Sequence, residues 1–369
     1  GDRTCTGTYL TDNIFLVYNT STINHKHWST ISPFRSKKRQ QIASDQSNDQ
    51  RPTTALLLFL SPIMIYFLSD DNWIYAYVVA VPLVLFFFGI IPSSALGKPH
   101  HKPSTSAVLI TGGSRGIGRD TADYLISKGY SVLVTVRKES QYDEMKNAAK
   151  ESNNKTPYPI LLDVTQDKHI PTAMKELQSF LEQHKKELIA VVNNAGINPE
   201  GDKINETLRK GERLKNILAE PSIGSRVFET NVIGVGRVTK ACLPYLAKEG
   251  RIVNIGSYFG SAAGMVRLDL CYYEASKFAL EGMTDNMRRS LRRKGIKVAL
   301  VKPGNILTDM NEDRGESTTL EVAVDIEHAI ASSTPKTRYY PGKVGGYQCR
   351  TLCMLYEMLP TWMSDKIRV

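Results

Sequence analysis

Residues 107–118, AVLITGGSRGIG, decide the fold of this chain. The stretch starts as an apolar run typical of a buried strand and continues through Gly112, Gly116 and Gly118 into a helical pattern near residues 119–128. Glycines let a backbone approach a pyrophosphate closely, and a helix N-terminus offers free N–H groups and partial positive charge. An ordinary strand-to-helix turn is the alternative, but the strand–loop–helix order favours a dinucleotide-binding loop.

Further apolar runs alternate with segments of helix length along the chain. They cover residues 131–136, 159–163, 188–193, 251–256 and 297–302. Strands that are apolar almost throughout are buried on both faces, which is typical of a parallel sheet covered by helices on each side. The sequence therefore predicts an α/β fold, a Rossmann-type doubly wound parallel sheet, with a catalytic domain over residues 107–310.

The N-terminal quarter of the chain has a different composition. Residues 1–54 are rich in Ser, Thr, Asn and Gln without periodicity, which predicts disorder or a targeting region. Two apolar runs follow within residues 55–91, and the second is long enough for a bilayer span of about 20 residues. One or two membrane segments are expected there, with a buried core helix as the alternative, and residues 92–106 form a polar linker.

The charge pattern bears on partners and location. The formal net charge is +10, but the basic residues are scattered and form no stripe with aromatic residues, so nucleic acid is not an expected partner. An anionic cofactor and membrane lipid account for the excess. Basic residues flank the apolar pair and two aspartates separate it, which favours both ends in the cytosol. The endoplasmic reticulum membrane is the expected location, with a mitochondrial or plastid membrane as the alternative.

The five cysteines form no C-x-x-C pair, and no metal site is expected.

A tyrosine and a lysine stand four residues apart in residues 273–277, YEASK. On a helix, Tyr273 and Lys277 project from the same face. A phenol has an ordinary pKa of about 10, and a neighbouring positive charge favours its ionised form. Lys277 is therefore expected to lower the pKa of Tyr273 toward neutral pH. Such pairs occur by chance on surface helices, but after a nucleotide loop the pair indicates redox chemistry.

The end of the second predicted strand bears on the choice of dinucleotide. An acidic residue there would hold a free ribose 2′-hydroxyl, whereas an arginine accommodates a 2′-phosphate. Arg137 stands at this position, and Arg115 lies within the glycine loop. Two guanidinium groups near one phosphate favour NADP(H) over NAD(H), although Arg137 as a solvated charge stays the alternative.

Taken in order, the motifs of residues 105 to about 310 resemble those of the short-chain dehydrogenase/reductase family, of the hydroxysteroid, retinol and hydroxybutyrate dehydrogenase-like kind. Besides the glycine loop, the matches are Asp163-Val164, the Asn-Asn-Ala-Gly motif at 193–196, the Tyr-x-x-x-Lys pair, and Pro303-Gly304 with Thr308. The cofactor-binding residues that the resemblance implies are Gly112, Ser114, Arg115, Gly116, Ile117, Gly118, Arg137, Asp163, Val164, Asn194, Ala195, Gly196, Tyr273, Lys277, Pro303, Gly304 and Thr308.

The resemblance also implies a catalytic set of Asn231, Ser257, Tyr273 and Lys277. Tyr273 would transfer a proton to or from the substrate oxygen, and Ser257 would hold that oxygen by a hydrogen bond. Lys277 would also bind the nicotinamide ribose, and Asn231 would position a water molecule. Ser257 and Tyr273 stand further apart than the family pattern leads us to expect, so Ser261 is a competing serine and an enlarged loop is expected before Tyr273.

The remaining segments bear on the substrate. Residues 198–224 are longer than expected where the family shapes access to its site, and residues 311–369 are expected to form a substrate lid and a C-terminal apolar helix. For residues 347–359, a core helix, a dimer contact and a membrane-resting surface are all open. A membrane-held enzyme suits a hydrophobic substrate, such as a steroid, retinoid or acyl lipid.

The expected function is NADP(H)-dependent interconversion of a secondary alcohol and a ketone on a small hydrophobic substrate. One alternative is an NAD-dependent hydroxybutyrate-type dehydrogenase, and another is a non-catalytic protein that senses the nucleotide. A third is a soluble enzyme whose apolar runs are a removed targeting sequence. Assembly into homo-oligomers stays open.

Overall fold

The computed structural model describes residues 101–151, 156–199, 221–263, 271–308 and 315–360. The expected targeting region and membrane segments at residues 1–91 lie outside this part of the chain. Within the described residues, no helix has both the length and the apolar character that a bilayer span requires. The described residues all belong to one compact unit, Ser93–Val369.

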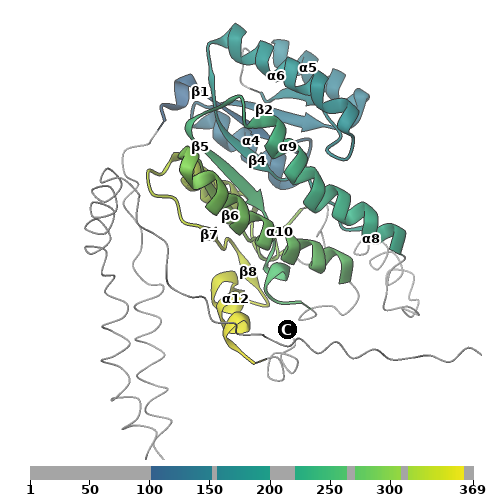
Figure 1. Cartoon of the computed structure of the whole chain (residues 1–369), viewed down its shortest axis with the longest axis vertical. Helices are drawn as coiled ribbons and strands as arrows, with labels where there is room; N and C mark the ends of the chain where they lie inside the picture. Colours follow the sequence, from purple (N-terminus) through teal and green to yellow (C-terminus); the bar gives the residue numbers. More distant parts are fainter. Residues whose placement is uncertain (1–100, 152–155, 200–220, 264–270, 309–314, 361–369) are drawn as a thin grey trace, which may run out of the picture. The chain divides into compact units, whose positions relative to one another are not determined.

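A seven-stranded sheet with all neighbouring strands parallel forms the centre of this unit (Figure 1). Its order is β3-β2-β1-β4-β5-β6-β7. The strands are β1 (Ser106–Ile110), β2 (Ser131–Val136), β3 (Tyr158–Leu161), β4 (Glu187–Asn193), β5 (Leu246–Ile255), β6 (Lys297–Val301) and β7 (Arg338–Tyr339). The doubly wound parallel sheet predicted from the sequence is therefore confirmed, and the two-residue β7 is an addition.

Helices cover both faces of the sheet. One face carries α4 (Gly116–Ser127), α5 (Glu139–Glu151) and α11 (Thr319–Ala331), and the other carries α6 (Ile170–His184), α9 (Gly234–Cys242) and α10 (Cys271–Leu291). The helix α8 (Pro221–Phe228) continues into α9 through the π-helical turn η4 (Glu229–Ile233). Short 3₁₀ turns are η2 (Pro103–Thr105), η3 (Asp167–His169), η5 (Tyr258–Gly260) and η6 (Arg292–Lys294). A hairpin of β8 (Lys343–Val344) and β9 (Tyr347–Gln348) leads into α12 (Cys349–Met358).

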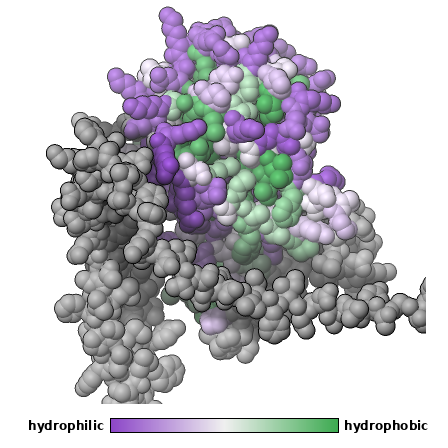
Figure 2. Space-filling model, viewed as in Figure 1, coloured by the Kyte–Doolittle hydropathy of each residue, from purple (hydrophilic) through white to green (hydrophobic). Residues whose placement is uncertain are grey.

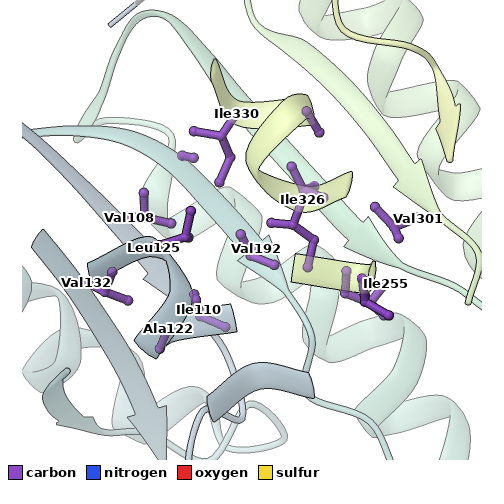
Figure 3. Packing of buried hydrophobic residues seen from close by; sticks show 14 of the residues in the cluster. Val108, Ile110, Ala122, Leu125, Val132, Val192, Ile255, Val301, Ile326 and Ile330 are labelled. Atoms are coloured by element: carbon purple, nitrogen blue, oxygen red, sulfur yellow. The ribbon is translucent and has the colours of Figure 1, made fainter. Parts of the chain in front are cut away.

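Both faces of β1 are buried, as its continuous apolar sequence predicts. Val108 and Ile110 share a core with Leu125 of α4 and Ile326 of α11 (Figure 3). The alternate residues of β1 pack in a second core with α6 and α9. Burying one such aliphatic side chain contributes about 1.5–3 kcal/mol, so β1 anchors the loop that follows it between two packed layers.

The outer helix α5 lies at the β3 end of the sheet and contacts β2 and β3. None of its residues is buried. Figure 2 shows mainly hydrophilic side chains over the end of the unit where α5 and α6 lie. This end of the molecule therefore presents a polar surface to solvent.

The C-terminal region contributes one helix to the main core. Within residues 311–337, α11 is part of the sheet packing, because Val322, Ile326 and Ile330 are fully buried in the main core. A helix with this burial is part of the core packing, and the substrate lid within residues 311–369 stays a prediction. The predicted apolar helix at residues 347–359 is α12, which buries one face, while Leu355 and Met358 are exposed on the other.

Candidate active site

A cleft of about 1170 Å³ follows the carboxyl ends of the strands. Residues one or two positions after the ends of the strands β1 to β6 line it, among them Gly112 after β1, Arg137 after β2, Asn194 after β4 and Pro303 after β6. Open parallel sheets bind ligands at this edge, where the strand order reverses. The reversal lies between β1 and β4, and the glycine loop stands at that point.

The glycine loop is shaped by its contacts with the loop after β4. Gly112 has a positive φ of 65°, and a Cβ there would lie 2.9 Å from Ala195 Cα. A Cβ on Gly118 would lie 2.5 Å from Asn194 Nδ2. The Asn194 amide in turn donates to the carbonyls of Thr111 at 2.9 Å and Gly112 at 3.0 Å. The close-packed loop leaves backbone N–H groups and the start of α4 beside the cleft, an arrangement that fits a pyrophosphate.

Two arginines stand where the sequence placed them, at the glycine loop and after β2. Arg115 and Arg137 are both exposed and line the cleft. Lys138 and Gln141 line the same region, and none of the described cleft residues from Thr135 to Gln141 is acidic. This part of the cleft is therefore suited to an anionic group.

The loop after β3 is held in place by Arg237, which belongs to none of the sequence motifs. Its guanidinium donates to the Val164 carbonyl at 2.6 Å and to Glu229 at 2.8 Å, and it also pairs with Asp167. Asp163 accepts hydrogen bonds within its own loop. Arg237 lies on α9, about seventy residues later in the chain, so no local pattern could have revealed this contact.

Tyr273, Lys277 and Ser257 meet at the other end of the cleft. The Tyr273 phenol is hydrogen bonded to Ser257, and Lys277 Nζ donates to the carbonyl of Ile255 at 3.1 Å. Burial raises the pKa of Tyr273 to about 12, while the hydrogen bond from Ser257 lowers it. Burial also lowers the pKa of Lys277 to about 8. The expectation that Lys277 lowers the pKa of Tyr273 was wrong for this structure, because burial outweighs the other influences on the phenol.

Asn231 lies in the π-helical turn η4 and is 1% exposed. Its side chain accepts from Ile197 N at 2.9 Å and donates to the Ile197 carbonyl and to Ser276 Oγ, both at 3.1 Å. A Cβ on Gly196 would lie 3.4 Å from Asn231 Oδ1 and 3.8 Å from Lys277 Nζ. Asn231 therefore lies behind the loop after β4, close to the lysine. Turns of this kind occur frequently at functional sites.

The predicted site residues mostly come together in one cleft. All the implied cofactor-binding residues line the cleft except Gly118. All the implied catalytic residues line it except Asn231. The competing serine, Ser261, accepts a hydrogen bond from Lys302 and donates one to Glu357. It is not part of the cleft lining, so Ser257 is the serine beside Tyr273.

The comparisons with known proteins agree with this geometry. The family model for short chain dehydrogenase matches residues 106–319. The chain belongs to this family. A short-chain dehydrogenase, anuI, of Penicillium roqueforti is 33% identical over 243 residues, 62% of this chain and 90% of that protein. Mitochondrial D-beta-hydroxybutyrate dehydrogenase of Bos taurus is 29% identical over 283 residues, 64% of this chain and 77% of the relative.

Two further matches are a curated relative and a solved structure. Retinol dehydrogenase 16 of Mus musculus is 27% identical over 303 residues, 70% of this chain and 86% of its own length. Among solved structures, a short chain dehydrogenase from Burkholderia cenocepacia in complex with NADP has a TM-score of 0.55 at 24% identity and covers 68% of this chain and all of its own. This likeness supports the fold described above for this chain, a parallel sheet covered by helices on both faces.

One wall of the cleft in this short-chain dehydrogenase is aromatic and was not foreseen. Tyr258 and Phe259 follow Ser257, stack on each other at 4.1 Å between ring centroids, and line the cleft with Ile306. The Phe259 ring meets Tyr273 edge-on at 6.1 Å. The only sequence signal was their position directly after the serine. The wall makes the region around Tyr273 apolar.

Proposed function

We propose that this short-chain dehydrogenase is an NADP(H)-dependent oxidoreductase that interconverts a secondary alcohol and a ketone on a hydrophobic substrate. The observation that carries the proposal is the hydrogen bond between Tyr273 and Ser257 at the cleft, with Lys277 one helical turn further along α10. When bound, the nicotinamide supplies or accepts a hydride. The residues of the chain then have to hold and protonate the substrate oxygen.

Tyr273 is the proton donor for a substrate oxygen in the direction of reduction. Burial raises the pKa of Tyr273 to about 12, so the free phenol is protonated at neutral pH and ready to donate. Ser257 holds the same oxygen by a hydrogen bond. Lys277 and Asn231 lie close together behind Gly196, where a buried lysine with a pKa near 8 is suited to relaying a proton toward solvent.

The cofactor proposal rests on the charge of the cleft. Arg115 and Arg137 flank the region that would receive a ribose 2′-phosphate, together with Lys138. Guanidinium groups bind phosphate with paired, charge-assisted hydrogen bonds. The glycine loop and the loop after β4 provide the close backbone approach that a dinucleotide needs. The NADP in the Burkholderia cenocepacia structure supports the same assignment.

The substrate proposal rests on the aromatic wall. Tyr258, Phe259 and Ile306 place apolar surface beside Tyr273, which favours an apolar alcohol or ketone. A relative named for retinol supports this class, whereas the relative named for hydroxybutyrate supports a small acid as the second candidate. Arg226 also lines the cleft and offers a charge for such an acid.

Membrane attachment through residues 55–91 is part of the proposal, with the endoplasmic reticulum as the location. It rests on the apolar sequence of those residues and on the hydrophobic substrate class. Washing membranes that carry the full chain with alkaline carbonate tests it. Retention in the pellet supports a membrane segment, and complete release overturns it.

The activity test is NADPH oxidation by the purified full chain, followed by absorbance with steroid, retinoid and acyl ketones and with a short β-keto acid. Tyr273→Phe should lower kcat by at least about 100-fold, because it removes the proton donor. Tyr272→Phe is the matched control on the same helix and should keep wild-type turnover. Equal turnover in Tyr273→Phe overturns the mechanism, and NADPH binding without turnover on any substrate supports a nucleotide sensor instead.

A further inference from the structure

Lys302 is fully buried at the end of β6, directly before Pro303 and Gly304 of the cleft. Its ammonium lies 2.6 Å from Glu281 Oε1 and 3.4 Å from Glu357 Oε1, and it donates to Ser261 Oγ. A buried ammonium without partners is very costly. Here it has three, each from a different part of the chain: α10, the loop after η5, and α12.

The partners of Lys302 surround the loop that carries Ser257. Ser261 ends the turn that starts after Ser257, and the Ser261 hydroxyl links Lys302 to Glu357. Glu281 stands one helical turn after Lys277 on α10. Its carboxylate lies so close to the backbone of residue 260 that a Cβ on Gly260 would overlap it.

The helix α12 packs directly on the same turn. Cys349, Leu352 and Cys353 form one buried cluster with Tyr258 and Phe259 of η5, and Tyr273 is at its edge. The Cys349 thiol donates to the Lys302 carbonyl at 3.3 Å. The C-terminal helix therefore reaches the proposed active site through both apolar contacts and the Lys302 network.

We propose that Lys302, together with Ser261 and Glu357, is a positioning group that fixes the turn of residues 257–261 and so aligns Ser257 with Tyr273. The proposal rests on the proposed function, because it assigns Ser257 a role in the reaction. It makes α12, which lies outside the matched family segment, a support of the site. Buried ion pairs are weak sources of stability compared with apolar packing of the same volume. Their directional bonds instead define one geometry, which suits a role in alignment.

The central test is Ser261→Ala in the full chain, which removes the bridging hydroxyl and little volume. We expect kcat to fall by about ten-fold, because small misplacements of reacting groups have large effects, while KM for NADPH changes less than about two-fold. Ser261→Thr keeps a hydroxyl and should restore most of the activity. Ser290→Ala is the control, since this exposed serine of α10 bonds only weakly to Asn286 at 3.4 Å.

Glu357→Gln provides a second variant that should fold, because Glu357 is 46% exposed. In Ser261→Ala and Glu357→Gln, hydrogen exchange of the cofactor-free protein should be faster than in the wild type for peptides that cover residues 257–262. Lys302→Met tests the centre of the network, with Arg251→Met as its control. Arg251 is the other fully buried cation in the described core, and it bonds to the Ser332 carbonyl away from the cleft.

Wild-type kcat and unchanged exchange in both Ser261→Ala and Glu357→Gln overturn the proposal. An equal loss of kcat in Lys302→Met and Arg251→Met, at equal loss of stability, also overturns it. Tyr273→Phe separates this failure from failure of the proposed function. If Tyr273→Phe loses turnover while Ser261→Ala keeps it, the function stands and only the positioning role fails.

Discussion

The ammonium of Lys277 lies 5.5 Å from the ring centroid of Tyr273, and its hydrogen bond goes to the backbone carbonyl of Ile255 at 3.1 Å. Both side chains are perturbed by burial, in opposite directions: the phenol is held protonated, and the pKa of the lysine is lowered to about 8. Burial of this ammonium away from water is unfavourable for folding. It is consistent with a site whose geometry serves chemistry rather than stability.

Lys277→Met should stabilise the fold at pH 7 while abolishing turnover. The folded pKa of about 8 lies below the ordinary value of 10.5, so the unfolded state binds more protons between these values and stability rises with pH across that window. Below pH 8 the penalty for the charged lysine is about 3 kcal/mol at 1.36 kcal/mol per pKa unit. Urea unfolding at pH 7 should show that the free energy of unfolding of the variant exceeds that of the wild type by up to about this amount. The difference should shrink toward pH 10. Lys150→Met, at an exposed position of α5, should show neither effect.

Gly118→Ala should destabilise the protein by about 1–3 kcal/mol and weaken NADPH binding. The added methyl would meet Asn194 Nδ2 and the Gly112 carbonyl at 2.5 Å, so the glycine loop would have to shift. Gly282→Ala is the matched control, because it lies inside α10 with no atom within 4 Å of the added Cβ, and it should stabilise the protein by about 0.5–1 kcal/mol. Thermal unfolding and fluorescence titration with NADPH measure both effects. Equal stability of the two variants would contradict the packing described for the loop.

Arg137→Glu should shift the cofactor preference from NADPH toward NADH. The new carboxylate would repel a 2′-phosphate and accept a hydrogen bond from a free 2′-hydroxyl. We expect kcat/KM for NADPH to fall by about 10- to 100-fold, corresponding to about 1.4–2.7 kcal/mol of lost charge-assisted binding. Steady-state kinetics with both cofactors measure the change. Unchanged kcat/KM for both NADPH and NADH would show that Arg137 is only a solvated charge.

Arg237→Gln should raise KM for NADPH with little change in kcat. The substitution removes the bonds that hold the Val164 carbonyl and Glu229 beside the cleft, whereas Tyr273 lies elsewhere in it. A rise of about 5- to 30-fold is expected from the loss of about 1–2 kcal/mol of hydrogen bonding. Arg119→Gln breaks an exposed ion pair with Asp123 and serves as the control. A fall in kcat with unchanged KM would contradict this assignment.

The parts of the fold that the sequence predicted best are those with strong local patterns. The continuous apolar runs identified six strands of the sheet, because a strand buried on both faces has no polar alternation. The short β7 has only Arg338 and Tyr339, so no pattern marked it. The packing of α11 in the main core was not predicted, because a helix with one buried face cannot be told from a surface helix without knowing what it packs against.

The sequence by itself determined those candidate site residues that stand close together in the chain. Local spacing places the glycine loop at the start of a helix and Tyr273 one turn before Lys277, and these relationships hold wherever the segments lie in space. Only the tertiary structure decided which serine meets Tyr273 and which forces set its pKa. It also brought Arg237 to the loop after β3 and Lys302 to the turn after Ser257, because contacts between distant segments depend on how the layers pack. Burial, which no single segment encodes, is the physical reason that the lysine and the tyrosine titrate differently from the way their spacing alone predicts.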